Sequence, residues 1–161
     1  MRRRAALLLV IVGLLLAPAG CEDAASGEVK LEVVSHSALL KKLQKWRGKV
    51  VVLDLWASWC QPCKQSFPHL VEMHHKYADR GVICVSVSLD KVEDKDYALK
   101  FLQAQNATFP NYLLEDGDDA MQNYFGVNGI PAVFVYDRDG QMLGPYRDYA
   151  IVEKVVKNLL K

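Results

Sequence analysis

The sequence has no internal repeat, no low-complexity segment and no large excess of charge of either sign. The absence of a repeat excludes solenoid and propeller architectures. Its 20 Lys and Arg residues nearly balance 19 Asp and Glu residues, for a net charge of +1 at pH 7. Nucleic-acid-binding domains usually carry a clear basic excess, so no nucleic-acid partner is expected. With 161 residues, 51% of them hydrophobic, the chain has room for one ordinary globular domain.

Long hydrophobic runs are also scarce, and the longest one lies at the N-terminus. Residues 5–17 are apolar and directly follow three arginines. Because this run is too short to span a bilayer as a stable helix, we predict a secretory signal peptide over residues 1–20. Removal of the three arginines leaves 17 basic and 19 acidic residues, a net charge of −2 in the mature chain.

One of the four cysteines stands where this leader ends. Cleavage after Ala19 would satisfy the small-residue rule, whereas cleavage before Cys21 would leave a first mature cysteine for acylation, as in bacterial lipoproteins. The end of the leader resembles a lipobox, although Pro18 stands where that motif usually has Leu. We predict a lipidated Cys21, a polar tether over residues 21–27, and a periplasmic or otherwise extracytoplasmic protein anchored to the membrane.

Two other cysteines stand close together in the segment Trp59-Cys60-Gln61-Pro62-Cys63-Lys64. A β-forming run over residues 50–56 precedes the segment and a helical pattern follows it, which places Cys60 at a helix N-terminus. Unpaired N–H groups and the helix dipole stabilise a thiolate there, and a thiolate is the nucleophile in disulfide exchange. A buried thiol pair or half of a zinc site would show the same spacing. The Trp before the thiols and the Pro between them favour redox chemistry.

Hydrophobic periodicity predicts an α/β domain over residues 28–161. We expect strands over residues 29–34, 50–56, 82–89, 132–136 and 141–143, a short extended segment over 111–114, and helices over 38–46, 60–78, 94–104, 118–125 and 148–160. The second strand, the second helix and the third strand form a right-handed parallel unit. Its thiol turn therefore lies at the carboxyl end of a strand, where open α/β sheets usually place their sites.

This order of elements, together with Trp-Cys-x-Pro-Cys-Lys at residues 59–64 and the later Gly129-Ile130-Pro131, resembles the thioredoxin superfamily over residues 28–161. An additional helix and strand over residues 94–114 resemble the exported, membrane-tethered thiol-disulfide oxidoreductases of the TlpA/ResA type. The resemblance implies a thioredoxin fold: a mixed central sheet flanked by helices, with a helix-plus-strand insertion after the second core strand.

The resemblance also implies roles for single residues. Cys60 would be the attacking thiol, Cys63 the resolving thiol, and Pro131 a cis-proline that faces the pair. The backbone of Ile130 would then be free to pair with an extended substrate segment. Asp54, inside the buried strand, would help move the proton of the resolving thiol. The alternative for this residue is a structural Asp hydrogen-bonded to a nearby hydroxyl.

The side chains around the thiols are expected to meet the substrate. We predict substrate contact for Trp59, Gln61 and Pro62, and a packing role for Trp56. The Gln61-Pro62 dipeptide also contributes to the reduction potential of the pair. The remaining cysteine, Cys84, stands among apolar residues in a predicted strand and is interpreted as a buried, inert thiol.

Two positions depart from the resemblance. Ser66 stands where the TlpA/ResA type commonly has Glu. The strand over residues 82–89 lacks the Lys that cytoplasmic thioredoxins place near the buried acid, and it offers only hydroxyls and a thiol. The resemblance therefore leaves open which groups surround Asp54.

We expect an exported enzyme that exchanges disulfides with protein substrates. Its redox group would be the Cys60–Cys63 disulfide, with no other cofactor. Its partners would be protein thiols or disulfides and a membrane redox donor or acceptor, and the chain would act as a monomer. The resemblance suggests a reductant in cytochrome c maturation as the client process, but these residues do not set the direction of electron transfer.

Two other functions, metal transport and peroxide reduction, also use a pair or a single cysteine. A copper or zinc carrier would bind its cargo through the same two thiols with help from a histidine, and the candidates are His69, His74 and His75. Because adjacent side chains such as His74 and His75 diverge on a helix, no metal site is predicted. A peroxiredoxin-like peroxide reductase would need a peroxidatic cysteine, and no Thr-x-x-Cys pattern occurs at this turn.

Overall fold

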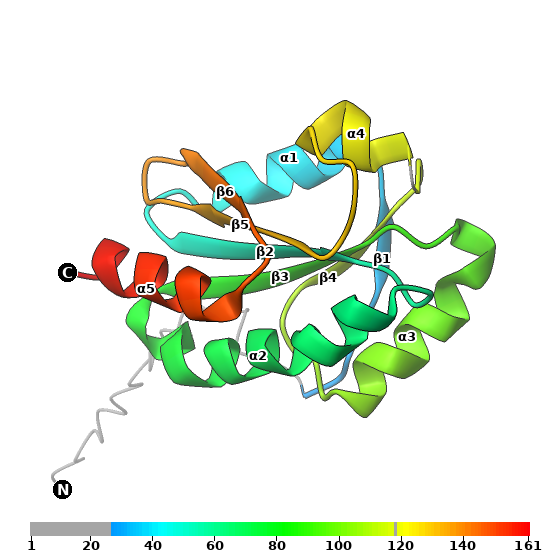
Figure 1. The fold of residues 1–161 in the computed structure, drawn as a ribbon, viewed down its shortest axis with the longest axis horizontal. Coiled ribbons are helices and arrows are strands. Elements are labelled where there is room, and N and C mark those ends of the chain that lie inside the picture. The colour runs from blue at the N-terminus through cyan, green and yellow to red at the C-terminus, as the bar shows by residue number, and fades with distance from the viewer. Residues whose placement is uncertain (1–26, 118) are drawn as a thin grey trace, which may run out of the picture.

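A computed structural model describes residues 27–117 and 119–161. Within them, helices cover both faces of a six-stranded sheet (Figure 1). The strands are β1 (Glu32–Val34), β2 (Val50–Trp56), β3 (Val82–Ser88), β4 (Asn111–Leu114), β5 (Ala132–Tyr136) and β6 (Met142–Tyr146). The α-helices are α1 (His36–Lys45), α2 (Gln61–Tyr77), α3 (Lys95–Ala104), α4 (Asp119–Phe125) and α5 (Tyr149–Leu159), with the 3₁₀ turns η1 (Ala78–Arg80) and η2 (Val92–Asp94).

The sheet has the strand order β1-β4-β3-β2-β5-β6. Strands β1, β4, β3 and β2 run parallel, and β5 and β6 join them as antiparallel neighbours. All seven residues of the central strand β2 are buried, which explains its almost continuous apolar sequence. The turn after β2 therefore leaves the middle of the sheet at the carboxyl end of a parallel strand.

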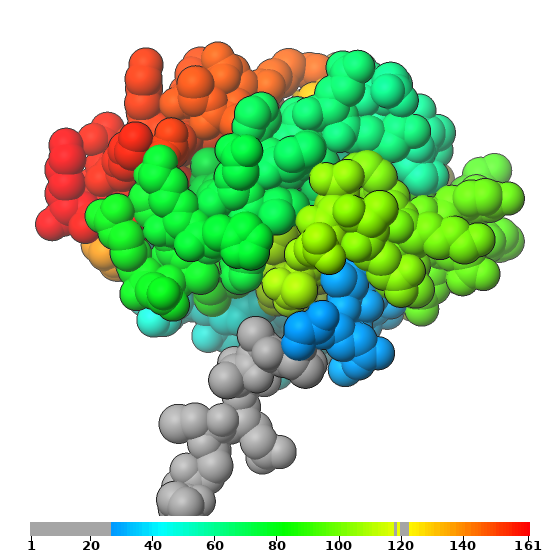
Figure 2. Space-filling model, turned by 90° about the horizontal axis from the view of Figure 1, so that it is seen from below, coloured from blue at the N-terminus to red at the C-terminus, as the bar shows by residue number. Residues whose placement is uncertain are grey.

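Side chains of β2 alternate between two apolar cores. Val50, Val52 and Trp56 pack with α2, α3 and α5, whereas Val51, Leu53 and Leu55 pack with α1 and α4. Asp54 has the same parity as Val52 and Trp56, so its side chain lies on the α2–α5 side of the sheet. Figure 2 shows this side, with α2 in green between α5 in red and α3 in yellow-green.

The predicted fold class and the order of the elements are confirmed. The inserted α3 and β4 follow β3, and β4 lies between β1 and β3. Several predicted boundaries were wrong by a few residues. Strand β1 begins at residue 32 rather than 29 because only residues 32–34 have partners in β4. Helix α1 begins at His36 rather than Ala38, since the Ser35 hydroxyl caps it by accepting a hydrogen bond from the Ala38 amide at 3.3 Å.

The predicted leader is not part of this description. The signal peptide (1–20), Cys21 and all but the last residue of the tether (21–27) lie outside the described residues. In the described ranges, none of the helices has the length and apolar character needed to span a membrane.

Candidate active site

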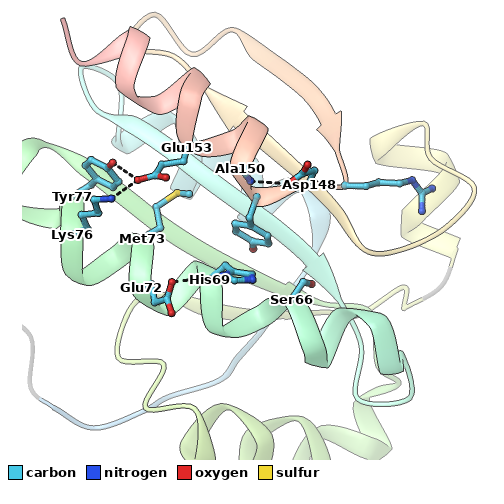
Figure 3. A pocket seen from close by; sticks show the side chains of 11 residues that line it. Ser66, His69, Glu72, Met73, Lys76, Tyr77, Asp148, Ala150 and Glu153 are labelled. Carbon is cyan, nitrogen blue, oxygen red and sulfur yellow. Dashed lines mark hydrogen bonds and ion pairs between the residues drawn. The ribbon is translucent and has the colours of Figure 1, made fainter.

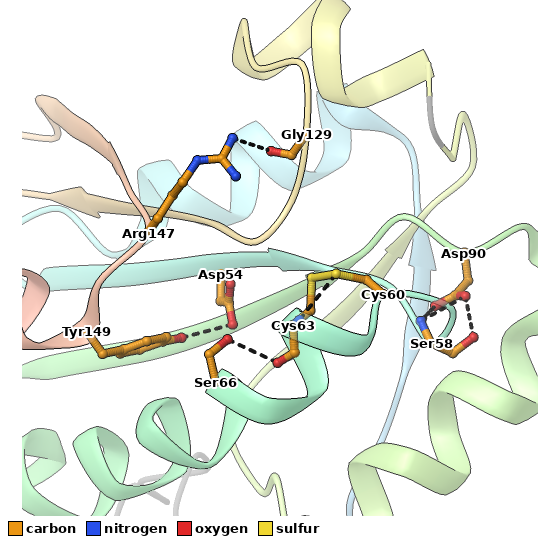
Figure 4. Close-up of a disulfide and its surroundings, with 9 residues drawn as sticks. All are labelled: Asp54, Ser58, Cys60, Cys63, Ser66, Asp90, Gly129, Arg147 and Tyr149. Carbon is orange, nitrogen blue, oxygen red and sulfur yellow. Dashed lines mark hydrogen bonds between the residues drawn. A yellow bond between two sulfur atoms is a disulfide. The ribbon is translucent and has the colours of Figure 1, made fainter.

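Cys60 and Cys63 form a disulfide at the N-terminus of α2 (Figure 4). Cys60 is the N-cap residue, with extended backbone angles, and its Sγ accepts a hydrogen bond from the Cys63 amide at 3.3 Å. Pro62 stands in the first turn of α2. Backbone N–H groups in a first turn make no hydrogen bond within the helix, so the N–H that proline lacks is not needed there. Cys60 is 5% exposed and Cys63 is fully buried. Of the two sulfurs, the Cys60 sulfur is the one that an incoming thiol or disulfide reaches first.

The first turn of α2 favours a negative charge on Cys60. The Cys63 N–H donates to the Cys60 sulfur, and no acidic side chain occurs in this turn. Both features stabilise a thiolate relative to a thiol once the disulfide is reduced. This geometry agrees with the placement predicted from the strand-to-helix junction.

A buried carboxylate holds the turn that leads into the disulfide. Asp90, 1% exposed at the end of β3, accepts hydrogen bonds from the Ser58 amide at 2.9 and 3.1 Å and from the Ser58 hydroxyl at 2.6 Å (Figure 4). The Ser88 hydroxyl donates a further bond at 2.6 Å. Sequence reasoning missed Asp90, although an acidic residue directly after a buried apolar strand was a signal that it has a partner.

The side chains around the disulfide divide as predicted into a rim and a base. Trp59 is 57% exposed, and Gln61 and Pro62 are exposed beside it. Trp56 is fully buried and packs against Phe67, with ring centroids 5.2 Å apart. Trp59 is therefore open to solvent beside the disulfide, whereas Trp56 supports the turn from within the core.

The loop before β5 lies across from the disulfide. The Ile130–Pro131 peptide bond is cis, as predicted. Arg147, at the end of β6, reaches this loop and donates a hydrogen bond to the Gly129 carbonyl at 3.4 Å (Figure 4). A second cis bond, Gly144–Pro145, was not anticipated.

Asp54 lies fully buried on the side of β2 that carries α2 and α5. The Tyr149 hydroxyl donates a hydrogen bond to its Oδ2 at 2.9 Å, and within the described residues its Oδ1 has no hydrogen-bond partner. Burial raises the pKa of Asp54 to about 7, and the hydrogen bond from Tyr149 opposes part of that rise. A carboxyl group with this pKa can take up or release a proton near neutral pH. In Figure 4, Asp54 lies between Tyr149 and Cys63.

Ser66, which departs from the resemblance, bonds within its own helix, and Cys84 is a buried thiol on β3. The Ser66 hydroxyl donates to the Cys63 carbonyl at 3.1 Å, within α2. Cys84 is buried, and burial raises the pKa of its thiol far above the ordinary range. A thiol that stays protonated is a poor nucleophile, which agrees with the prediction of an inert cysteine.

The histidines considered for metal binding have different neighbours, although the ring centroids of His74 and His75 lie 5.7 Å apart. His69 is next to Glu72, at 3.6 Å, and the ring of His74 packs on Phe109, with centroids 5.3 Å apart. Among residues 27–117 and 119–161, no three or more His, Cys, Asp or Glu side chains are grouped closely enough to hold a metal ion.

Comparison with known proteins places these features in a family. A family model described as thioredoxin-like matches residues 48–142. The chain is 29% identical over 121 residues to the thiol-disulfide oxidoreductase ResA of Bacillus thuringiensis subsp. konkukian, a match that covers 74% of this chain and 67% of that protein. It is 33% identical over 101 residues to ResA of Geobacillus thermodenitrificans, covering 63% of this chain and 56% of the relative.

Solved structures agree with these relatives. A crystal structure described as a thiol:disulfide interchange protein DsbE from Chlorobium tepidum has a TM-score of 0.65 and 37% identity, covering 74% of this chain and 85% of that one. The thioredoxin domain of a thiol-disulfide oxidoreductase from Bacteroides vulgatus has a TM-score of 0.61 and 25% identity, covering 71% and 84%.

A disulfide at the N-terminus of a helix, a cis-proline directly before a strand that pairs with the end of β2, and a buried acid within β2, on a mixed sheet, define a protein-disulfide oxidoreductase with a thioredoxin fold. The chain belongs to the thioredoxin-like family, and within that superfamily it is a protein of the TlpA/ResA type.

Proposed function

We propose that Cys60 attacks and Cys63 resolves in disulfide exchange with extracytoplasmic protein substrates, with Asp54 as the proton acceptor for Cys63. The observation that carries this division of roles is the unequal burial of the two cysteines: Cys60 caps α2 and is 5% exposed, whereas Cys63 is fully buried. A substrate reaches the first sulfur, and only the protein's own Cys60 reaches the second.

The reaction starts from the reduced pair when the substrate carries a disulfide. The Cys60 thiolate attacks one substrate sulfur, a mixed disulfide forms, and the other substrate sulfur leaves as a thiolate that takes a proton from solvent. Cys63 then gives its proton to Asp54 and attacks the Cys60 sulfur. The second substrate sulfur leaves as a thiolate that takes a proton from solvent, so the substrate is released as a dithiol. The substrate gains two electrons and the protein ends as the Cys60–Cys63 disulfide. Each step is reversible, so the same groups oxidise a dithiol when the protein starts as the disulfide.

Substrate positioning falls to the rim and the cis-proline loop. Exposed Trp59 offers an aromatic surface beside the disulfide, flanked by Gln61 and Pro62. The backbone of Ile130, directly before the cis-proline, pairs with an extended substrate segment and brings its sulfur to Cys60.

The same proposal includes the compartment and the partners. The chain is exported, acylated on Cys21 and held at the membrane by residues 21–27, where it acts as a monomer between protein substrates and a membrane redox donor or acceptor. The leader pattern and the similarity to ResA proteins support this placement. Reduction of apocytochrome c before haem attachment is the client process that we favour. Incorporation of labelled palmitate that Cys21→Ala abolishes tests the anchor, and equal labelling of the variant would contradict it.

Insulin reduction driven by dithiothreitol tests the reaction itself. Cys60→Ser must abolish the activity, and Cys63→Ser must accumulate a mixed disulfide on Cys60. Cys84→Ser is the matched control, because it removes a sulfur that is buried away from the site. Full activity in Cys60→Ser would reject the assignment. Substrates trapped on Cys63→Ser in cells identify the clients and, from their thiol state, the direction of electron flow.

A further inference from the structure

Asp54 receives a hydrogen bond from one group in the described part of the chain, the Tyr149 hydroxyl. The neighbouring residue on β3, Ser86, carries a hydroxyl on the same side of the sheet. That hydroxyl donates to Asn111 Oδ1 at 2.8 Å. Since the Asn111 amide nitrogen is itself bonded to backbone carbonyls at 2.7 and 2.8 Å, its oxygen is fixed toward Ser86. The Ser86 hydroxyl therefore donates its hydrogen bond to Asn111 and not to Asp54.

The titratable groups that face Asp54 leave the same conclusion. Strand β3 contributes the buried thiol of Cys84, and α5 contributes Tyr149. On α2, Cys63 is bonded to Cys60 in the disulfide and carries no titratable proton in this state. On β5 the residue opposite Asp54 is Val133, which has no charge. None of these groups is a cation. Within the described residues, the Tyr149 hydroxyl is the group that favours the carboxylate over the neutral acid.

We propose that Tyr149 is a positioning residue for Asp54: its hydroxyl holds Oδ2 of the carboxylate and leaves the unpartnered Oδ1 to receive the proton of Cys63. This inference rests on the proposed function in one respect, the transfer of that proton to Asp54. The bond links two residues 95 positions apart, on β2 and at the first turn of α5. Cytoplasmic thioredoxins place a lysine from the strand after the active-site helix near the buried acid, but that strand in this chain, β3, has none. The Tyr149 hydroxyl is the group that bonds to the acid here.

Tyr149 also lies in the wall of a groove of about 510 Å³ between α2 and α5 (Figure 3). The same groove contains a second tyrosine–carboxylate pair, in which the Tyr77 hydroxyl donates to Glu153 Oε1 at 2.6 Å. Tyr77 and Tyr149 are both buried, but the Tyr77 hydroxyl bonds to Glu153 rather than to Asp54. Tyr77→Phe is therefore a matched control for Tyr149→Phe, because each removes one hydroxyl and one hydrogen bond to a carboxylate from the same groove.

The primary experiment titrates Asp54 in the oxidised full chain by NMR with ¹³C-labelled aspartate, which needs no turnover. Loss of a hydrogen bond to the charged form should raise the midpoint by about one pH unit in Tyr149→Phe. It should leave the midpoint near pH 7 in Tyr77→Phe. At pH 7 the ionised share of Asp54 then falls from about a half to about a tenth, so resolution of the mixed disulfide slows about fivefold. Above pH 9 the two rates should converge.

Two further measurements separate the possible outcomes. In an Asp54→Asn background, Tyr149→Phe should have no additional effect on the pH profile. In the wild-type protein, the ¹³Cζ resonance of Tyr149 should move with the Asp54 titration, a test that holds even if Tyr149→Phe does not fold. An unmoved resonance, an unchanged midpoint, an equal shift in Tyr77→Phe or a persistent slowing in the Asp54→Asn background would overturn the inference. Because the titration uses oxidised protein, it stands or falls independently of the Cys60→Ser activity test.

Discussion

Replacement of Asp54 by Asn should make the oxidised protein more stable at pH 8 and change its stability little at pH 4. Burial raises the folded-state pKa of Asp54 from 3.8 to about 7. The folded state therefore binds the proton more tightly than the unfolded state, and unfolding releases it between these two values. The contribution of Asp54 to stability is highest below pH 4 and is lost as the pH rises toward 7.

The size of the effect follows from the shift. A difference of about 3 pKa units corresponds to at most about 4 kcal/mol, at about 1.4 kcal/mol per unit. An asparagine of nearly the same shape carries no charge at any pH. Asp54→Asn therefore removes the fall in stability that the wild-type protein shows as the pH rises from 4 to 7. The free energy of unfolding of the variant should exceed that of the wild-type protein by several kcal/mol at pH 8.

Urea unfolding of both oxidised proteins at pH 4, 6 and 8 provides the measurement. The difference between the two proteins should grow with pH over this range, and other titrating groups cancel in the difference. A difference that is constant with pH, or that favours the wild-type protein at pH 8, would refute the reasoning that the carboxyl is desolvated. The same variant should exchange disulfides more slowly but measurably, because it cannot accept the proton of Cys63.

Three further outcomes follow from the site. Asp90→Asn should lower the free energy of unfolding by about 1–3 kcal/mol in urea titrations, since it weakens the bonds that hold the Ser58 turn, whereas Glu93→Gln on the exposed turn nearby should change it little. Trp59→Ala should raise the KM for a protein substrate with little change in stability, and Trp56→Ala should cost about 3–5 kcal/mol; the reverse pattern would contradict the rim and base assignment. Cys84 should resist iodoacetamide in the folded protein at pH 8, and mass spectrometry that finds it alkylated would contradict its assignment as inert.

Much of the site was predictable because its signals are local. The apolar run of β2 predicts a strand buried on both faces, and the thiol pair directly after it predicts a helix N-terminus at Cys60. An aspartate inside such a run needs a reason, so Asp54 was identifiable without coordinates. The roles of Cys60, Cys63 and Pro131 came from the resemblance. The disulfide follows the carboxyl end of β2, and Pro131 precedes the β5 residue that pairs with Leu55 near that end.

Other features depended on contacts between distant segments. Residues 29–31 have strand propensity like that of residues 32–34, but only the latter meet β4, so the edge of the sheet set the boundary. The Asp90–Ser58 bonds join residues 32 positions apart, and no spacing rule connects them.

The sequence by itself determined the reactive chemistry of this protein, because a thiol pair, its strand-to-helix junction and a buried acid are all encoded within a short stretch of chain. Only the tertiary structure decided what surrounds that acid. Tyr149 reaches Asp54 because α5 packs against the same face of the sheet as α2, and Ser86 is withdrawn from it because Asn111 lies on the next strand. Hydrogen bonds between segments far apart in sequence form only when packing brings their donors and acceptors together, so the setting of the proton acceptor became visible only in the folded chain.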